Sequence, residues 1–153
     1  MAKRVQLGDV IEIPTAKGFA YAQCSHKHPR FGHLIRILPG FHQTRPASFG
    51  TFVKQKEQFV TFFPLGAAVH RGIFEIVTHE EIPEEAQAFP LFRDGVENPK
   101  TGRVNDWWLW DGQREWRVGD LTPEQRQLPI RAIWTDLLLI QRIEEGWTPS
   151  KEV

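Results

Sequence analysis

The sequence predicts a mainly β fold of short, mostly antiparallel strands with a few short helices, the longest of them near the C-terminus. Three observations lead to this prediction. Runs of β-branched and aromatic residues are short and end at turn residues. Eleven prolines and twelve glycines interrupt the 153 residues, and helix signals are concentrated late in the chain. A chain of this length favours a single compact domain with one core, covering residues 1–153.

Five of the predicted strands lie in the N-terminal half. The first two, residues 10–13 and 19–24, are joined by a segment of Pro, Lys and Gly that is typical of a hairpin. The third, residues 32–38, alternates in hydrophobicity and ends at Pro39. The other two strands cover residues 59–63 and 72–78. A single helical turn is expected at residues 83–86.

A tryptophan-rich hairpin is predicted in the second half of the chain. Residues 107–110 and 113–118 flank the pair Asp111 and Gly112, which favours the primed turns of tight hairpins. The stretch 93–104 is polar and rich in turn residues, so we expect a long loop there.

Two helix starts carry capping signals. Thr122 is followed by proline and by Gln125, which predicts a capped helix of one or two turns. Thr135 begins a longer amphipathic helix that Gly146 ends. The apolar run at 137–140 alternatively fits a buried strand.

The composition argues against several classes of protein. Nineteen basic and nineteen acidic side chains balance, which disfavours nucleic acid or an anionic membrane as the main partner. The charge is unevenly distributed along the chain. Residues 1–60 carry nine basic and three acidic side chains, and the excess is balanced by an acidic remainder. Cys24 is the sole cysteine, so a disulfide-stapled secreted scaffold is excluded. No apolar run approaches the roughly 20 residues of a membrane helix and no signal peptide is apparent, so we expect a cytoplasmic protein.

Histidines supply one candidate site. His26 and His28 occupy alternate positions, which in a strand would point both imidazoles to the same face. Together with His33, His42 or His70 they would hold a divalent metal such as zinc, which lowers the pKa of a bound water. The alternative is that the polar, basic stretch around them is an ordinary solvated hairpin loop.

Arginines supply a second candidate. Five of them lie among aromatic or apolar residues and need carboxylate or carbonyl partners if they are buried. Structural ion pairs are the favoured interpretation, and a clamp for a phosphoryl group is the alternative, because the guanidinium fork fits phosphate oxygens. The arginines are Arg36, Arg45, Arg71, Arg93 and Arg131, and the candidate partners are Asp9, Asp94, Asp106 and Asp136.

Three tryptophans within four residues supply the third candidate. Alternation places Trp108 and Trp110 on one sheet face, with Trp107 and Leu109 on the other. Either the late helix and Trp147 bury both faces, or one face is exposed and serves as a partner site, since Trp and Arg are typical of binding hot spots.

Strong catalytic motifs are missing from the sequence. It contains no Gly-x-Ser-x-Gly, no glycine-rich phosphate loop, no dinucleotide fingerprint and no Cys-x-x-Cys. Cys24 has histidines nearby, as a Cys-His nucleophile would, but its strand position favours a buried and inert thiol.

A succession of motifs runs along nearly the whole chain. In order, these are GDVIEIP at 8–14, GFAYAQ at 18–23, HKH at 26–28, LIR at 34–36, FFPL at 62–65, IP at 82–83, FR at 92–93, WLWDG at 108–112 and RIE at 142–144. This succession resembles the immunity protein 26 family. That family is described as all-β, its members are proposed to neutralise toxins of bacterial polymorphic toxin systems, and it includes small bacterial phosphotriesterases (HocA type).

The resemblance implies two functions of different classes. An immunity protein would cover a toxin through aromatic and arginine anchors and would need no cofactor. Its candidate anchors are Trp107, Trp108, Trp110 and Arg93. We favour this binding function because the sequence lacks a strong catalytic motif. A blander third interpretation is a β domain that binds a small ligand in an aromatic pocket.

A phosphotriesterase would instead use a metal-bound hydroxide to attack phosphorus in an organophosphate ester. Residue chemistry then suggests His26 and His28 as metal ligands, with His33 or His70 as a third ligand or base. Arg36 or Arg71 would hold the phosphoryl oxygen.

Overall fold

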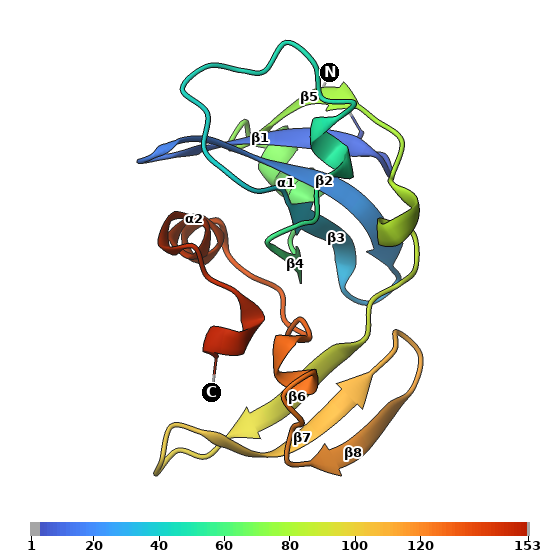
Figure 1. Ribbon diagram of the computed structural model, residues 1–153, viewed down its shortest axis with the longest axis vertical. Coiled ribbons are helices and arrows are strands. Elements are labelled where there is room, and N and C mark those ends of the chain that lie inside the picture. The colour runs from blue at the N-terminus through green and yellow to red at the C-terminus, as the bar shows by residue number, and fades with distance from the viewer. Residues whose placement is uncertain (1–3, 153) are drawn as a thin grey trace. The chain divides into compact units, whose positions relative to one another are not determined.

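The computed structural model describes residues 4–152 and confirms the mainly β class. It contains two antiparallel sheets and two α-helices, the longer of which lies near the C-terminus. The described residues form two compact units: a first unit of residues 4–88 and 133–147, and a second unit of residues 89–132 and 148–152. In Figure 1 the sheet of the first unit runs from blue to green, and that of the second from yellow to orange. Each unit has its own apolar cluster.

The first unit is built on a five-stranded sheet. Its predicted opening hairpin is present, because β1 pairs with β2 in antiparallel register. Gly18 closes this hairpin with φ +120°, and a Cβ there would lie 2.9 Å from the His42 carbonyl oxygen, so the position requires glycine. The strand order is β4-β3-β2-β1-β5, with β1 at Asp9–Thr15, β2 at Gly18–His28, β3 at Gly32–Ile37, β4 at Phe59–Phe62 and β5 at Glu75–His79.

Strand β2 is longer than predicted. It continues past Cys24 to His28, with a register shift against β3 between Cys24 and His26. Ser25 is the extra residue of this bulge. The solvated-loop alternative is therefore not formed at His26 and His28, which lie in the strand itself.

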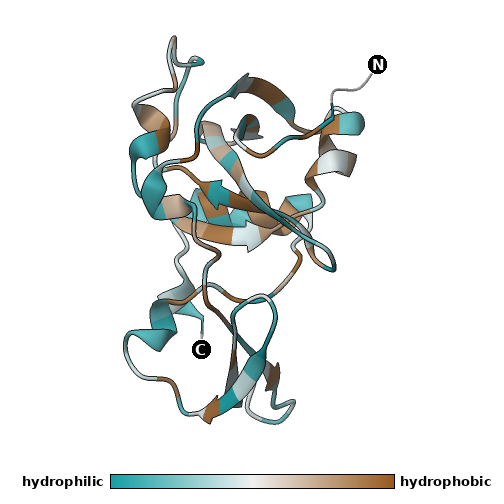
Figure 2. Ribbon diagram, turned by 90° about the vertical axis from the view of Figure 1, so that its right-hand side faces the viewer, coloured by the Kyte–Doolittle hydropathy of each residue, from teal (hydrophilic) through white to brown (hydrophobic). Residues whose placement is uncertain are grey.

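An aromatic cluster fills one part of the first unit. The rings of Tyr21, Phe49 and Phe52 meet at centroid distances of 5.0 to 6.1 Å, and Val10 and Leu38 are buried beside them. Figure 2 shows hydrophobic residues running through the strands of this sheet. Burial of these side chains is the main force holding the sheet together.

The late helix α2, at Asp136–Glu145, begins and ends as predicted. Thr135 caps it by accepting the backbone N–H of Leu138 at 3.2 Å, and Gly146 ends it with φ +66°. The strand alternative for residues 137–140 is not formed. The buried residues of α2 are Leu139 and Ile143.

The other helical segments of the first unit are short. The expected turn at residues 83–86 is present as the 3₁₀ helix η2, at Glu84–Ala86. Two segments were not predicted, the helix α1 at Leu65–His70 and the 3₁₀ helix η1 at Phe52–Lys54.

The second unit is built on a three-stranded sheet in the order β6-β7-β8, with β6 at Phe92–Glu97, β7 at Val104–Trp110 and β8 at Glu115–Gly119. The prediction of a loop over 93–104 is wrong for its first part, which forms most of β6. Phe92 pairs with Trp110, and the resulting burial outweighs the weak strand propensity of Asp94 and Gly95. Gly95 is needed here, because a Cβ would lie 2.3 Å from Cγ1 of Val104.

The predicted hairpin between β7 and β8 is present, since Trp110 pairs with Glu115. Its tip lies at Gly112 and Gln113, because the backbone N–H of Asp111 donates to the Arg114 carbonyl oxygen at 3.1 Å and Gly112 has a φ of +103°. Asp111 has no positive φ, so a type I′ turn centred on Asp111 and Gly112 is not formed. Oδ1 of Asp111 accepts the N–H groups of Gln113 and Arg114, at 2.9 and 2.8 Å. These bonds favour the carboxylate and lower the pKa of Asp111.

Short 3₁₀ helices complete the second unit, η3 at Gln125–Gln127 and η4 at Pro149–Lys151. The reciprocal bonds of the predicted capping box form, since Thr122 and Gln125 exchange backbone N–H to side-chain oxygen bonds of 3.0 and 3.2 Å, but η3 itself begins only at Gln125. The segment then stops before Pro129. None of the helices in residues 4–152 has the length and apolarity needed to cross a bilayer.

Candidate functional site

The register of the second sheet defines two faces. Asp94 of β6 and Arg117 of β8 lie opposite Trp108 of β7, and Glu115 lies opposite Trp110. Directly opposed residues in antiparallel strands point to the same side. We call this side the Trp108 face, and it carries Asp94, Trp108, Trp110, Glu115 and Arg117. The other side carries Arg93, Trp107, Leu109 and Trp116, so Trp108 and Trp110 share one face and Trp107 and Leu109 the other, as predicted.

The buried tryptophans are held by arginines and aromatic rings. Trp107 and Trp110 are each 5% exposed. The Arg93 guanidinium lies 4.7 Å from the Trp107 ring, and the Arg131 guanidinium lies 5.2 Å from the Trp110 ring. Phe92 packs on Trp110 with a centroid distance of 5.4 Å. These two tryptophans therefore belong to the interior of the structure.

Trp108 and Trp116 remain accessible, with 38% and 40% of their surfaces exposed. They lie on opposite faces of the sheet, because Trp116 is opposite Leu109. Of the four predicted partner residues, only Trp108 therefore reaches solvent. Trp107, Trp110 and Arg93 are buried, and the Arg93 side chain donates to the carbonyl oxygens of Leu128 and Pro149.

A hollow of about 260 Å³ lies beside Trp108. Its apolar side chains are Trp108 and Val96, and Val96 is 88% exposed. Its charged side chains are Asp94, Asp106, Glu115 and Arg131. Exposed apolar surface beside charged groups is typical of a binding surface. We take this hollow as the candidate functional site.

Ion pairs hold the rim of the hollow in place. Arg131 pairs with Asp94, which is one of the four candidate partners named from the sequence, and also with Glu115 at 3.1 Å. Asp106 accepts from Arg117 at 2.7 Å, and this hydrogen bond raises the pKa of the Arg117 guanidinium. Every charged side chain of the rim thus has an ion-pair partner.

The predicted histidine ligands do not converge. His33 pairs with Lys27, whereas His26 and His28 pair with Leu34 and Gly32. Because side chains alternate along a strand, His33 points to the face opposite the other two. Burial, and secondarily the Lys27 charge, lower the pKa of His33. Throughout the described chain, no group of three His, Cys, Asp or Glu side chains is arranged to hold a metal ion.

His26 and His28 are engaged in local contacts. Nε2 of His26 donates to the Gln87 carbonyl oxygen at 2.8 Å, and Nδ1 lies 2.9 Å from Oγ of Ser25. Nδ1 of His28 accepts the backbone N–H of Arg30 at 3.1 Å. Both rings thus stabilise neighbouring backbone.

His42 and His70 lie elsewhere in the first unit. His42 contacts the rings of Tyr21 and Phe52, at 5.5 and 5.0 Å. His70 is the last residue of α1.

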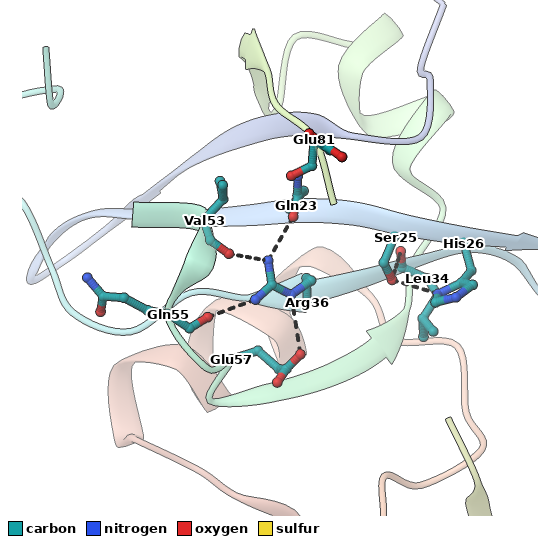
Figure 3. A network of polar contacts seen from close by, with 9 residues as sticks. All are labelled: Gln23, Ser25, His26, Leu34, Arg36, Val53, Gln55, Glu57 and Glu81. Atoms are coloured by element: carbon teal, nitrogen blue, oxygen red, sulfur yellow. Dashed lines mark hydrogen bonds and ion pairs between the residues drawn. The ribbon is translucent and has the colours of Figure 1, made fainter. Parts of the chain in front are cut away.

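Arg36, the first candidate for a phosphoryl clamp, is buried in a dense polar network and is 2% exposed. Figure 3 shows its guanidinium between four acceptors. It donates to Oε1 of Gln23 at 2.7 Å, to the carbonyls of Val53 and Gln55 at 2.8 Å each, and to Glu57 at 3.2 Å. This is a structural ion pair, although its partner is Glu57 rather than one of the predicted aspartates.

The second clamp candidate, Arg71, is exposed just after α1.

The thiol of Cys24 is fully buried, and burial raises its pKa to about 12. At neutral pH this thiol is protonated, as the prediction of an inert thiol requires.

Sequence reasoning missed two residues with exposed apolar side chains. The sequence predicts a polar loop at Val96 and a strand position without a binding role for Trp116. Alternation against Leu109 would have placed Trp116 on a face, but only the pairing register shows which residues lie opposite it.

Comparisons of this chain with protein-family models, with curated proteins and with solved structures found no match.

Proposed function

We propose that this chain is an immunity-type protein that binds and neutralises a cognate toxin of a bacterial polymorphic toxin system. The toxin would contact the Trp108 face of the second unit. The observation that carries the proposal is the half-exposed Trp108 ring beside a hollow with a charged rim. The resemblance in sequence to the immunity protein 26 family supplies the class of partner.

The position of Trp108 suits a binding anchor. It lies in β7, the central strand, which is paired on both sides. The backbone beneath the ring is therefore fixed before binding, so little conformational entropy is lost when a partner covers it. Tryptophan in such a place is typical of the few residues that dominate interface energies.

The contacts of the residues that the alternative hydrolase would need favour the binding function over hydrolysis. Arg36 already donates to four acceptors of its own chain. His33 points away from His26 and His28. A phosphotriesterase site would require these groups to leave their present partners, whereas binding through Trp108 requires no rearrangement.

The test is protection of growing cells. Each toxin candidate encoded beside the gene is expressed with this chain, and survival and complex formation are measured. We expect the chain to restore growth, and Trp108→Ala to weaken the complex by about 30-fold or more, the effect of removing a hot-spot residue. Trp116→Ala is the matched control, because that ring is equally exposed on the opposite face.

Three outcomes would contradict the proposal. Failure of the unsubstituted chain to protect against every neighbouring toxin would refute the immunity function. Equal protection by Trp108→Ala would refute the docking face. Hydrolysis of paraoxon by the purified chain, abolished by a chelator, would favour the enzyme instead.

A further inference from the structure

The hollow beside Trp108 is amphipathic. One part of its wall consists of the exposed Val96 side chain and the Trp108 ring, and the rest consists of charged groups. A volume of about 260 Å³ accommodates one long side chain rather than a whole helix or strand. The structure therefore restricts the chemistry of what enters: an aliphatic stem that ends in a polar head.

The charges of the hollow favour a cation as that head. Three carboxylates line it, against the single positive charge of Arg131. Arg117 neutralises one carboxylate from outside the lining, through Oδ1 of Asp106. The local balance is therefore one net negative charge, which attracts a cation and repels an anion.

Two carboxylate oxygens remain open to an incoming donor. Arg117 contacts Oδ1 of Asp106, and Arg131 contacts Oε2 of Glu115. The other oxygens of these two side chains, which are 50% and 51% exposed, have no hydrogen-bond donor among residues 4–152. They can accept hydrogen bonds without loss of the existing ion pairs.

The same sheet already shows how it binds a guanidinium. Arg93 lies over Trp107 at 4.7 Å and Arg131 lies over Trp110 at 5.2 Å. Trp108, the remaining tryptophan of this run, has no cation over its ring in the described part of the chain. Its exposed ring is an equivalent platform without an occupant from its own chain.

We propose that the hollow receives a cationic side chain of the toxin, an arginine or a lysine. This inference rests on the proposed immunity function. The stem of that side chain contacts Val96 and Trp108, and its head bonds the open oxygens of Asp106 and Glu115. An apolar side chain would instead remove the open oxygens of these two carboxylates from water and supply no donor in exchange.

The test uses small probes, so that it does not depend on finding the toxin. The indole N–H signals of the ¹⁵N-labelled full chain are followed by NMR while Nα-acetyl-arginine amide, the lysine analogue or the citrulline analogue is added. Citrulline has nearly the shape of arginine without its charge. The Trp108 signal is assigned by its absence in Trp108→Phe, and the Trp116 signal is the internal control.

We expect saturable shifts of the Trp108 signal with arginine and lysine, and about five- to tenfold weaker binding of citrulline, as loss of a cation–π contact and an exposed ion pair predicts. Glu115→Gln should weaken arginine binding several-fold, and 0.5 M NaCl should do the same. Stronger binding of arginine than lysine would identify ring stacking as the larger contribution.

Equal shifts with citrulline, or no Trp108 shift with any probe, would overturn the inference. The immunity function is judged separately by growth. If cells are protected through Trp108 but the probes do not bind, the cationic occupant is wrong and the function stands. If the probes bind but no toxin is neutralised, the hollow is a cation site of a protein with another role.

Discussion

Replacement of Arg36 by methionine tests whether this arginine holds the first unit together. Methionine keeps most of the apolar stem and removes all donors. Oε1 of Gln23 and the Val53 carbonyl, both in buried residues, would then lose a hydrogen bond each. The acceptors on Gln55 and Glu57 are nearer to solvent and can be rehydrated.

The magnitude follows from these two buried acceptors. Leaving one buried acceptor unpaired costs about 1–3 kcal/mol, and Arg36→Met leaves two of them. We therefore expect Arg36→Met to lower the free energy of unfolding by about 2–6 kcal/mol. The Gln23 amide would also loosen, although it still donates to the Glu80 carbonyl at 3.0 Å.

Urea unfolding measures this loss. Circular dichroism follows the unfolding of the sheets, and tryptophan fluorescence, which includes Trp134 and Trp147 of the first unit, is the second probe. The expected loss lowers the urea midpoint by about 1 M or more. Arg71→Met is the control, because that arginine is exposed, and its effect should stay within about 0.5 kcal/mol.

A loss below about 1 kcal/mol for Arg36→Met would refute the reasoning, since two buried acceptors cannot go unpaired at so low a cost. It would also reopen the interpretation of Arg36 as a clamp for an external oxyanion.

Three further predictions follow from the same structure. Hydrogen bonding by Arg45, together with that by the Tyr21 hydroxyl, lowers the pKa of the buried Glu12 below 4.5. The ionised Glu12 carboxylate therefore stabilises the folded state at neutral pH, and this contribution is lost as the pH falls below that value. Urea unfolding from pH 6 to pH 3 should therefore show a shallower loss in Glu12→Gln than in the unsubstituted chain, and equal slopes would exclude this linkage. The Cys24 thiol, with its pKa near 12, should react with a disulfide reagent at pH 8 only after urea unfolding, and rapid modification of the folded chain would contradict its burial. Gly95→Ala should destabilise the second unit because its Cβ meets Val104, whereas Gly66→Ala in α1, where nothing lies within 4 Å, should stabilise the chain by about 0.5–1 kcal/mol; comparable thermal melting of the two variants would contradict the clash.

The elements predicted best are those whose signals are local. Thr135 and Gly146 bound α2, and Thr122 and Gln125 bond each other where the chain turns into η3, through contacts that span only three or four residues. Such contacts can be predicted from residues that are close together in the sequence. The opening hairpin was predictable for the same reason, since its two strands are joined by a short turn.

Strand β6 was not predictable in this way. Its polar residues resemble a loop, and it becomes a strand because Phe92 and Arg93 are buried opposite Trp110 and Leu109, more than ten residues away. The clamp candidate Arg36 shows the same limit. Its type suggested a buried pair, but the partners arrive from a separate segment around Val53.

The histidine site depended on a register that the sequence does not contain. Alternation correctly put His26 and His28 on one face once the strand continued to His28. The position of His33 is decided by its pairing with Lys27, which the bulge at Ser25 sets. One residue of register is enough to move a side chain to the other face.

The exposure of Trp108 has an equally specific cause. Arg93 exchanges backbone hydrogen bonds with Pro129 and Arg131, at 2.9 and 3.0 Å, so the segment 129–131 lies along β6. This placement brings the Arg131 guanidinium over Trp110. Trp108 lies two residues earlier on β7, roughly 7 Å along the strand, and has no such cover. This long-range bridge, together with Phe92, covers Trp110 and leaves Trp108 exposed, so the proposed binding surface begins where the segment 129–131 leaves the sheet.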